Sequence, residues 1–241
     1  GLNKETSRVI RLQTNDEISE LENYRNFNFN VPALSKKYIR LKADLVTGQK
    51  TGFFLDQREN RKLLGEFSKG KKVLNTFCYT GGFSIYAMSA GAELVTSVDI
   101  SQKAVDLAAS NMELNFPNAN HKAVADDVFN FMKEHTQQYD VIVLDPPAFA
   151  KSIKSKHTAT QAYKRLNIAG LKALAPNGIL FTFSCSQVID DVLFYNTVAA
   201  AAIETGRNIR VLHKLEQGPD HPTNIYHPEG HYLKGLVLFV E

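Results

Sequence analysis

Short apolar runs alternate with amphipathic stretches along the chain after Lys71. Runs of aliphatic and β-branched residues are typical of strands buried on both faces of a parallel sheet, and apolar residues spaced three and four apart are typical of the helices that cover it. The pattern predicts strands over Val73–Phe77, Leu94–Asp99, His121–Ala125, Tyr139–Asp145, Gly178–Cys185, Asn208–Leu215 and Tyr232–Val240. It predicts helices over Phe83–Ala90, Gln102–Asn115, Val128–Glu134, Thr160–Leu174 and Asp190–Glu204.

The last predicted strand is reached without a helix. Only the loop Gly218–Gly230, rich in Pro, Asp and His, precedes it. Parallel neighbours need a long crossover, so we expect this strand to return as a hairpin, antiparallel to the others. The expected fold class is α/β, a Rossmann-like seven-stranded sheet with its last strand antiparallel. This arrangement resembles class I S-adenosylmethionine-dependent methyltransferases, and at this point the resemblance is one of fold alone.

Residues 1–60 have a different pattern, in which apolar and basic residues alternate as in half-exposed antiparallel strands. The expected elements are strands over Val9–Leu12 and Tyr38–Lys42 and a hairpin over Leu45–Leu55 that turns near Gly48. The segment Asn23–Asn30 fits an exposed loop and fits an edge strand at least as well, so it is left unassigned. We therefore expect a small β-rich domain over 1–60 and a second domain over 61–241.

Composition narrows the class of protein. The 241 residues are 44% hydrophobic and 22% charged, and two cysteines are too few for a disulfide framework. No apolar run approaches a membrane span, and Gly1–Glu5 lacks the apolar segment of a signal peptide. A reducing cytoplasm is the expected location. The net charge of +3 permits a nucleic-acid partner, which must be argued from where the charges lie.

Glycines and carboxylates follow the first three strands of the predicted sheet. Gly81 and Gly82 let the backbone approach a ligand closely, but the three-glycine spacing of a pyrophosphate site is absent. Asp99 is placed to accept hydrogen bonds from ribose hydroxyls, and Asp127 from an adenine amino group, although each could equally be a helix N-cap. Together they predict S-adenosylmethionine as the cofactor. The residues expected to contact it are Tyr79, Thr80, Gly81, Gly82, Asp99, Ile100, Asp127, Val128 and Asp145.

The fourth and fifth strands end in residues suited to catalysis. Asp145 follows a buried run and precedes Pro146, which is either a simple turn or the wall of a pocket. The fifth strand ends at Cys185. If the two strands are neighbours, as the fold resemblance implies, their backbones lie about 5 Å apart. A thiol and a carboxylate would then share one pocket.

That pair suits methylation at carbon 5 of cytosine, which has little nucleophilicity of its own. A thiolate that adds to carbon 6 makes carbon 5 enamine-like, so that it can accept a methyl group from a sulfonium. Asp145, hydrogen-bonded to the base, would stabilise charge that appears on the ring. The alternative for Cys185 is a small buried hydrophobe, and we expect this inert role for Cys78 in the cofactor turn. The sequence does not identify the base that removes the carbon 5 proton.

Several segments resemble the RlmI-type family of 23S (large-subunit) ribosomal RNA cytosine-5 methyltransferases. They are Lys50–Arg58, Cys78–Ser84, Leu144–Phe149, Phe183–Ser186 and Pro228–Gly235. The resemblance implies S-adenosylmethionine as donor, Cys185 as nucleophile, Asp145 as its partner, and Gln57 and Arg58 near the cofactor. It implies that the N-terminal region is the family's central β-rich domain. Family members usually begin with a PUA RNA-binding domain, which residues 1–45 do not resemble, so either the chain was trimmed or this member lacks that domain.

A basic loop follows the two prolines. Lys151, Lys154 and Lys156 place positive charge at the mouth of the expected pocket, where RNA phosphates would lie, although a solvated face is the usual meaning of such a run. Pro146 and Phe149 are expected to contact the target base. The expected partner is RNA, and the resemblance implies 23S rRNA. We expect no membrane partner. The sequence leaves open whether the protein is a monomer or a homodimer.

Two alternatives to cytosine methylation remain at this point. Methylation of guanine or a small molecule would leave Cys185 with a structural role, and an RNA-binding assembly factor would not turn over at all. The spacing of His221, His227 and His231 matches no compact metal site, so no metal is expected.

Overall fold

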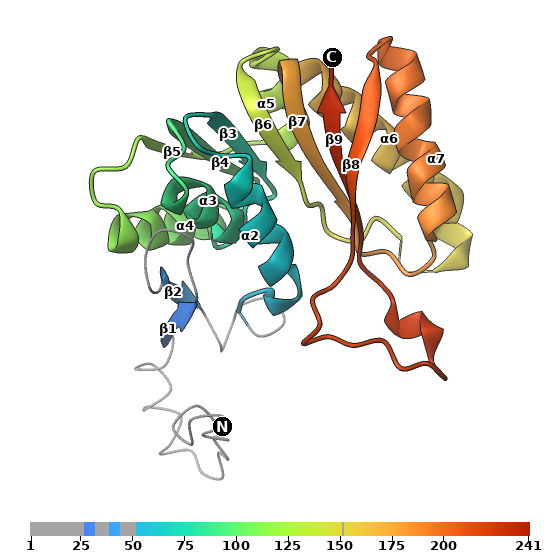
Figure 1. Cartoon of the computed structure of the whole chain (residues 1–241), viewed down its shortest axis with the longest axis horizontal. Helices are drawn as coiled ribbons and strands as arrows, with labels where there is room; N and C mark the ends of the chain where they lie inside the picture. The colour runs from blue at the N-terminus through green and yellow to red at the C-terminus, as the bar shows by residue number, and fades with distance from the viewer. Residues whose placement is uncertain (1–26, 32–38, 44–51, 151) are drawn as a thin grey trace.

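The computed structural model describes residues 27–31, 39–43, 52–150 and 152–241 (Figure 1). The predicted strand Val9–Leu12, the turn near Gly48 and Lys151 lie outside the described residues.

Seven strands form one sheet in the order β5-β4-β3-β6-β7-β9-β8. The strands are β3 (Lys72–Thr76), β4 (Leu94–Asp99), β5 (His121–Ala125), β6 (Tyr139–Leu144), β7 (Leu174–Ser184), β8 (Ile209–Leu215) and β9 (Lys234–Val240). The first five pair in parallel, and β9 lies between β7 and β8, antiparallel to both (Figure 1). The predicted fold class, including the reversed last strand, is confirmed.

Three helices pack on each face of this sheet. One face carries α2 (Arg58–Glu66), α3 (Gly82–Ser89) and α4 (Gln102–Asn115), and the other carries α5 (Val128–Glu134), α6 (Lys156–Ala173) and α7 (Asp191–Thr205). Successive residues of a strand point to opposite faces, so Val141 and Val143 enter one core while Ile142 and Leu144 enter the other. The side chains of β6 are thus buried on both faces of the sheet, and this packing fixes the position of the strand that precedes Asp145.

Several boundaries differ from the sequence-based expectation. Leu55, expected in a hairpin, begins a single turn of 3-10 helix, η2 (Leu55–Gln57), which leads into the unpredicted helix α2. The division expected at residue 60 falls within α2. β7 begins at Leu174, directly after α6, and therefore includes Pro176 and Asn177, which had the composition of a turn.

The described part of the N-terminal region is a two-stranded antiparallel sheet of β1 (Phe27–Val31) and β2 (Ile39–Ala43). The strand expected over Tyr38–Lys42 is confirmed as β2, and β1 overlaps the segment left unassigned. The backbone of β2 is hydrogen-bonded by amide side chains of α4: Asn115 pairs with Arg40, and Asn111 with Lys42, at 2.6 to 3.2 Å. The side chains of α4 thus make the hydrogen bonds to the β2 backbone that a neighbouring strand would otherwise make.

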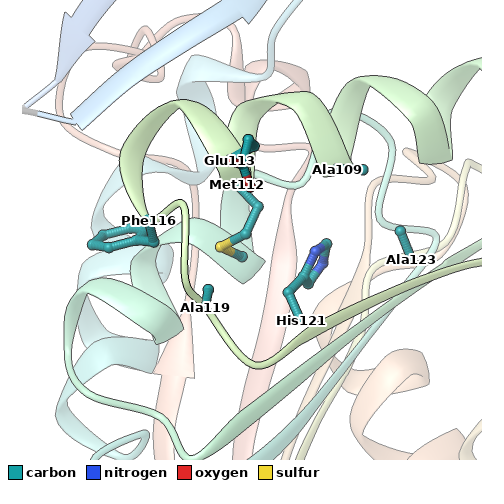
Figure 2. A pocket seen from close by; sticks show the side chains of 7 residues that line it. All are labelled: Ala109, Met112, Glu113, Phe116, Ala119, His121 and Ala123. Atoms are coloured by element: carbon teal, nitrogen blue, oxygen red, sulfur yellow. The ribbon is translucent and has the colours of Figure 1, made fainter.

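A pocket of about 310 Å³ lies between α4 and the edge strand β5 (Figure 2). Met112 of α4 and His121 of β5 line it, and His121 Nε2 lies 2.8 Å from Ser97 Oγ. His121 begins β5, whereas Asp127 follows the end of that strand. The pocket is therefore at the other end of β5 from the predicted cofactor residues.

Candidate active site

The carboxyl ends of β3 and β6 form the point at which the sheet changes direction. From β3 the chain proceeds through α3 to β4 on one side, and from β6 through α6 to β7 on the other. In open α/β sheets the crevice at such a point binds ligands. The turn after β3 and Asp145 after β6 both lie at this point, because Thr76 is paired with Leu144.

The turn after β3 has an unusual backbone. Phe77 and Tyr79 have φ of 52° and 46°, which non-glycine residues rarely adopt and which cluster at ligand sites. Gly81, at φ 79°, is the N-cap of α3. A Cβ there would lie 3.0 Å from Ala108 Cβ, so only glycine lets the turn pack on α4. This tight turn holds Thr80 and Gly82 at the end of β3, where both are buried.

Asp99 joins the first two strand ends. Its Oδ2 accepts a hydrogen bond from the Tyr79 N–H and its Oδ1 from the Ser101 N–H, each at 3.0 Å. A carboxylate has about four acceptor positions, so two remain for ribose hydroxyls. The adjacent Ile100 is 74% exposed. Asp99 thus shapes the turn at which the cofactor is expected and can also contact it.

Asp127 is the N-cap of α5, the alternative weighed from the sequence. Its Oδ1 accepts from the N–H groups of Phe129 and Asn130 at 2.9 and 3.1 Å. Val128 is buried, but Phe129 is 38% exposed at the same strand end. Exposed apolar side chains at 100 and 129 beside two carboxylates fit an adenosine, which has flat apolar faces and polar edges.

Asp145 is held by the turn that begins α2. Gln57 is buried, its Nε2 donates to Asp145 Oδ1 at 3.1 Å, and its Oε1 accepts from Asn60 at 2.7 Å. Arg61 lies within electrostatic range of Asp145 and stacks over Phe53, 4.5 Å from the ring centroid. Burial lowers the pKa of Arg61 to about 10, so it stays charged at neutral pH. The Gln57 amide thus orients the carboxylate by a hydrogen bond, and the buried Arg61 cation acts on it electrostatically.

Cys185 and Asp145 come from neighbouring strands, as expected. β6 pairs with β7 so that Leu144 lies opposite Thr182, and Cys185 Sγ lies 3.9 Å from the Pro146 carbonyl oxygen. The thiol is half-buried. Cys78 is buried, and burial raises the pKa of its thiol, which suits the inert role predicted for it.

Two buried serines anchor the residue between them. The Ser186 hydroxyl lies 3.0 Å from the Tyr163 hydroxyl and 3.4 Å from the Ala150 N–H, and Ser184 Oγ accepts from the Ser186 N–H at 3.4 Å. Strand β7 ends at Ser184, so these bonds replace the ladder beyond it. The Cys185 side chain is thereby presented from a fixed backbone.

The start of β9 completes the surroundings of the thiol. Lys234 is 3% exposed, and its Nζ donates to the carbonyl oxygens of Ser186 and Tyr232 at 2.9 and 2.7 Å. Burial lowers the pKa of this ammonium. The Tyr232 hydroxyl donates to Asp56 Oδ2 at 2.6 Å. These contacts connect the residues around Cys185 with the η2 turn around Asp145.

The other predicted residues differ in burial and in the contacts that they make. Pro146 is buried, and Phe149 packs on Tyr163 with ring centroids 4.7 Å apart. Lys154 is exposed on the 3-10 turn η3 (Ile153–Ser155), while Lys156 Nζ lies 3.5 Å from Asp190 Oδ2. The Arg58 side chain is paired with Glu59 and Asp220, each at 3.0 Å.

Sequence reasoning missed the roles of Asp56, Arg61, Tyr232 and Lys234. Asp56 lies beside Gln57 in a segment already singled out, and Tyr232 and Lys234 lie in another. Their presence in segments that resemble the family was the available signal. Arg61 had no comparable signal.

Within the described ranges, no three His, Cys, Asp or Glu side chains are grouped so that they could hold a metal ion. No helix of the same ranges has the length and apolar character needed to cross a membrane.

Comparison with known proteins agrees with this geometry. Ribosomal RNA large subunit methyltransferase I of Aeromonas hydrophila is 46% identical over 204 residues, 83% of this chain and 51% of that protein. A structure from Streptococcus mutans, described as a SAM-dependent methyltransferase, has a TM-score of 0.75 at 29% identity over 88% of this chain and 55% of its own. A methyltransferase complexed with SAH gives the same TM-score and identity, covering 88% of this chain and 56% of its own.

The chain spans about half the length of these relatives. A model of the S-adenosylmethionine-dependent methyltransferase family matches residues 20–237. The crevice, its carboxylates and this match agree on one cofactor, and the chain belongs to the S-adenosylmethionine-dependent methyltransferase family.

Proposed function

We propose that the protein methylates carbon 5 of a cytosine in 23S rRNA through a covalent bond between Cys185 and carbon 6 of the base. The observation that carries this proposal is a half-buried thiol beside a carboxylate at the ends of adjacent strands, in the crevice of a methyltransferase fold. The name of the Aeromonas hydrophila relative supports ribosomal RNA as the substrate. RNA is therefore the proposed partner.

The cofactor would lie along the ends of β3, β4 and β5. Asp99 would accept from the ribose hydroxyls, and Ile100 and Phe129 would contact the adenine faces. The residues proposed to line this site are Gln57, Tyr79, Thr80, Gly81, Gly82, Asp99, Ile100, Asp127, Val128 and Asp145. When bound, S-adenosylmethionine supplies the methyl group as an electrophile.

Cys185 would act first. Its thiolate adds to carbon 6, and the electron pair of the carbon 5–carbon 6 double bond becomes available at carbon 5. Asp145, oriented by Gln57, would hydrogen-bond the ring nitrogen as the protonated carboxylic acid and so stabilise the negative charge that addition produces. Phe149 and Pro146 would bound the base, and Lys154 and Lys156 would meet phosphates at the rim.

A mechanism-based trap tests this assignment. The substrate is a 23S rRNA transcript from the protein's own organism in which 5-fluorocytidine replaces cytidine. Because fluorine does not leave as a proton does, methyl transfer should leave protein and RNA covalently joined, and the complex should survive a denaturing gel. Cys185→Ala should give no complex and no methylation while binding S-adenosylmethionine as the parent does.

Cys78→Ala is the matched control, since it removes the other thiol and should still form the complex. Methylation by Cys185→Ala at the parent rate, or a complex that maps to Cys78, would contradict the proposal.

A further inference from the structure

The proposed reaction requires a proton acceptor. After methyl transfer, carbon 5 carries both the methyl group and its original hydrogen, and the thiol leaves only when that proton is removed. This requirement rests on the proposed function. The acceptor should lie near Cys185, because carbon 5 is bonded to the carbon that the thiol attacks.

Asp145, the carboxylate on the neighbouring strand, is already assigned to hydrogen-bonding the ring, and Tyr163, Tyr232 and Lys234 also lie within electrostatic range of the Cys185 thiol. The Lys234 ammonium already donates to two carbonyl oxygens, so it is a donor. Tyr163 is fully buried against the hydroxyl of Ser186, which is too weak a base at neutral pH. Tyr232 differs from both because it donates to a carboxylate, that of Asp56.

The fold places this pair between the two predicted catalytic groups. Lys234 lies opposite Ser184 in the β7–β9 ladder, so the antiparallel register brings Tyr232 alongside Ser186, next to Cys185. Asp56 is adjacent in sequence to Gln57, whose side chain donates to Asp145. The η2 turn therefore orients Asp145 with one side chain and Tyr232 with the next.

We propose that Tyr232, acting with Asp56, accepts the carbon 5 proton. Tyr232 Oη takes the proton as its own hydroxyl proton passes to Asp56 Oδ2. The electron pair of the carbon 5–hydrogen bond forms the carbon 5–carbon 6 double bond, and the pair of the carbon 6–Sγ bond returns to Cys185 as thiolate. The Asp56 proton then passes to water.

The geometry of the pair favours this coupled transfer. An O–H to O⁻ distance of 2.6 Å is that of a strong, charge-assisted hydrogen bond. Burial and the neighbouring Asp56 raise the pKa of Tyr232, so the phenol is protonated at rest. It can therefore receive a proton only as it passes its own to the carboxylate.

The test uses 23S rRNA with ordinary cytidine and S-adenosylmethionine labelled in the methyl group. Tyr232→Phe should accumulate a labelled covalent protein–RNA complex that the parent does not, with product release slowed by about 10²–10⁴-fold, the usual contribution of a general base. Asp56→Asn, which keeps a hydrogen-bonding group but accepts no proton, should accumulate the same complex. Tyr195→Phe, on the exposed side of α7, should behave as the parent.

The same variants with the 5-fluorocytidine transcript separate this inference from the proposed function. Tyr232→Phe should trap that RNA at the parent rate, since every earlier step is intact. The role of Tyr232 would be overturned if Tyr232→Phe released product from ordinary RNA at the parent rate without forming a complex. It would also be overturned if this variant failed to trap the fluorinated RNA while the parent traps it. If the parent itself neither traps that RNA nor makes 5-methylcytosine, the proposed function fails instead.

Discussion

The Asp99 carboxylate is placed to contact both the turn after β3 and the S-adenosylmethionine that the family binds. In the structure it already holds two backbone N–H groups, and in the proposed complex it also binds ribose. Asp99→Ala should weaken S-adenosylmethionine binding by about 1.5–3 kcal/mol, the range for hydrogen bonds to a charged group. Titration calorimetry measures this directly. Asp106→Ala, on the exposed side of α4, is the control, and equal affinity of Asp99→Ala and parent would remove Asp99 from the site.

His121 gives the protein a specific sensitivity to acid. Burial lowers the pKa of its ring to about 4, whereas in the unfolded chain it is about 6.5. Between these values the unfolded chain binds a proton that the folded chain does not, so stability should fall as the pH falls from about 6.5 towards 4. Urea unfolding measures the loss of unfolding free energy between pH 7 and pH 5. This loss should be smaller in His121→Asn than in the parent, by on the order of 1–2 kcal/mol. The exposed variant His157→Asn should keep the parent's decrease, and an unchanged decrease in His121→Asn would refute the assignment.

Single residues also show what the sequence can and cannot reveal. The positions of Asp145 and Cys185 at the ends of neighbouring strands were predictable, because each follows a buried strand and strand ends have a known place in this class of fold. The contact between Asp56 and Tyr232 joins residues 176 positions apart, so no local pattern could have paired them. Predicting it requires the register of β9 and the position of a helix that was not expected.

At the scale of elements, the strands of the main sheet were predicted but helix α2 was not. Both outcomes follow from the dependence of the prediction on apolar patterns in the sequence. The central strands are buried on both faces and each contains a run of apolar residues, whereas the buried side of α2 includes Asn60 and Arg61. A helix whose inner face is polar lacks the apolar periodicity by which helices are predicted. That polar face supports the contact with Asp145, because Asn60 donates a hydrogen bond to Gln57, which in turn donates to Asp145.

The contact between β7 and β9 depends on one glycine. A Cβ at Gly235 would lie 2.5 Å from the ring of Phe183, which is fully buried and cannot move aside cheaply. Gly235→Ala should destabilise the protein by about 1–3 kcal/mol, as overpacking does, measured by urea unfolding. Gly230→Ala, where the nearest atom would be 3.6 Å away, should change stability by less than about 0.5 kcal/mol. Equal stability of the two variants would mean that β9 adjusts to the added methyl.

Across the whole molecule, the proposed chemistry is confined to the carboxyl ends of the strands, where the loops after β6 and β8 also lie (Figure 1). Replacing Lys151, Lys154 and Lys156 by Gln should lower RNA affinity and leave cofactor affinity alone. The slope of log K against log salt should fall by about 0.7–0.9 for each phosphate that a lysine no longer neutralises. Lys69, Lys71 and Lys72, at the amino end of β3, give a control variant of equal charge change. An unaltered slope would assign the loop lysines to a solvated face.

The position of β9 has a consequence during synthesis. β9 follows β8 in the chain but lies inside the sheet, between β7 and β8. A nascent polypeptide that has emerged only as far as β8 therefore exposes an unpaired edge of β7, the kind of edge at which chains associate wrongly. The same strand supplies Lys234 and directly follows Tyr232, so the surroundings of the thiol are assembled last. Premature termination before β9 should yield an aggregating product that has the cofactor turn and Cys185 but lacks Tyr232 and Lys234 beside the thiol.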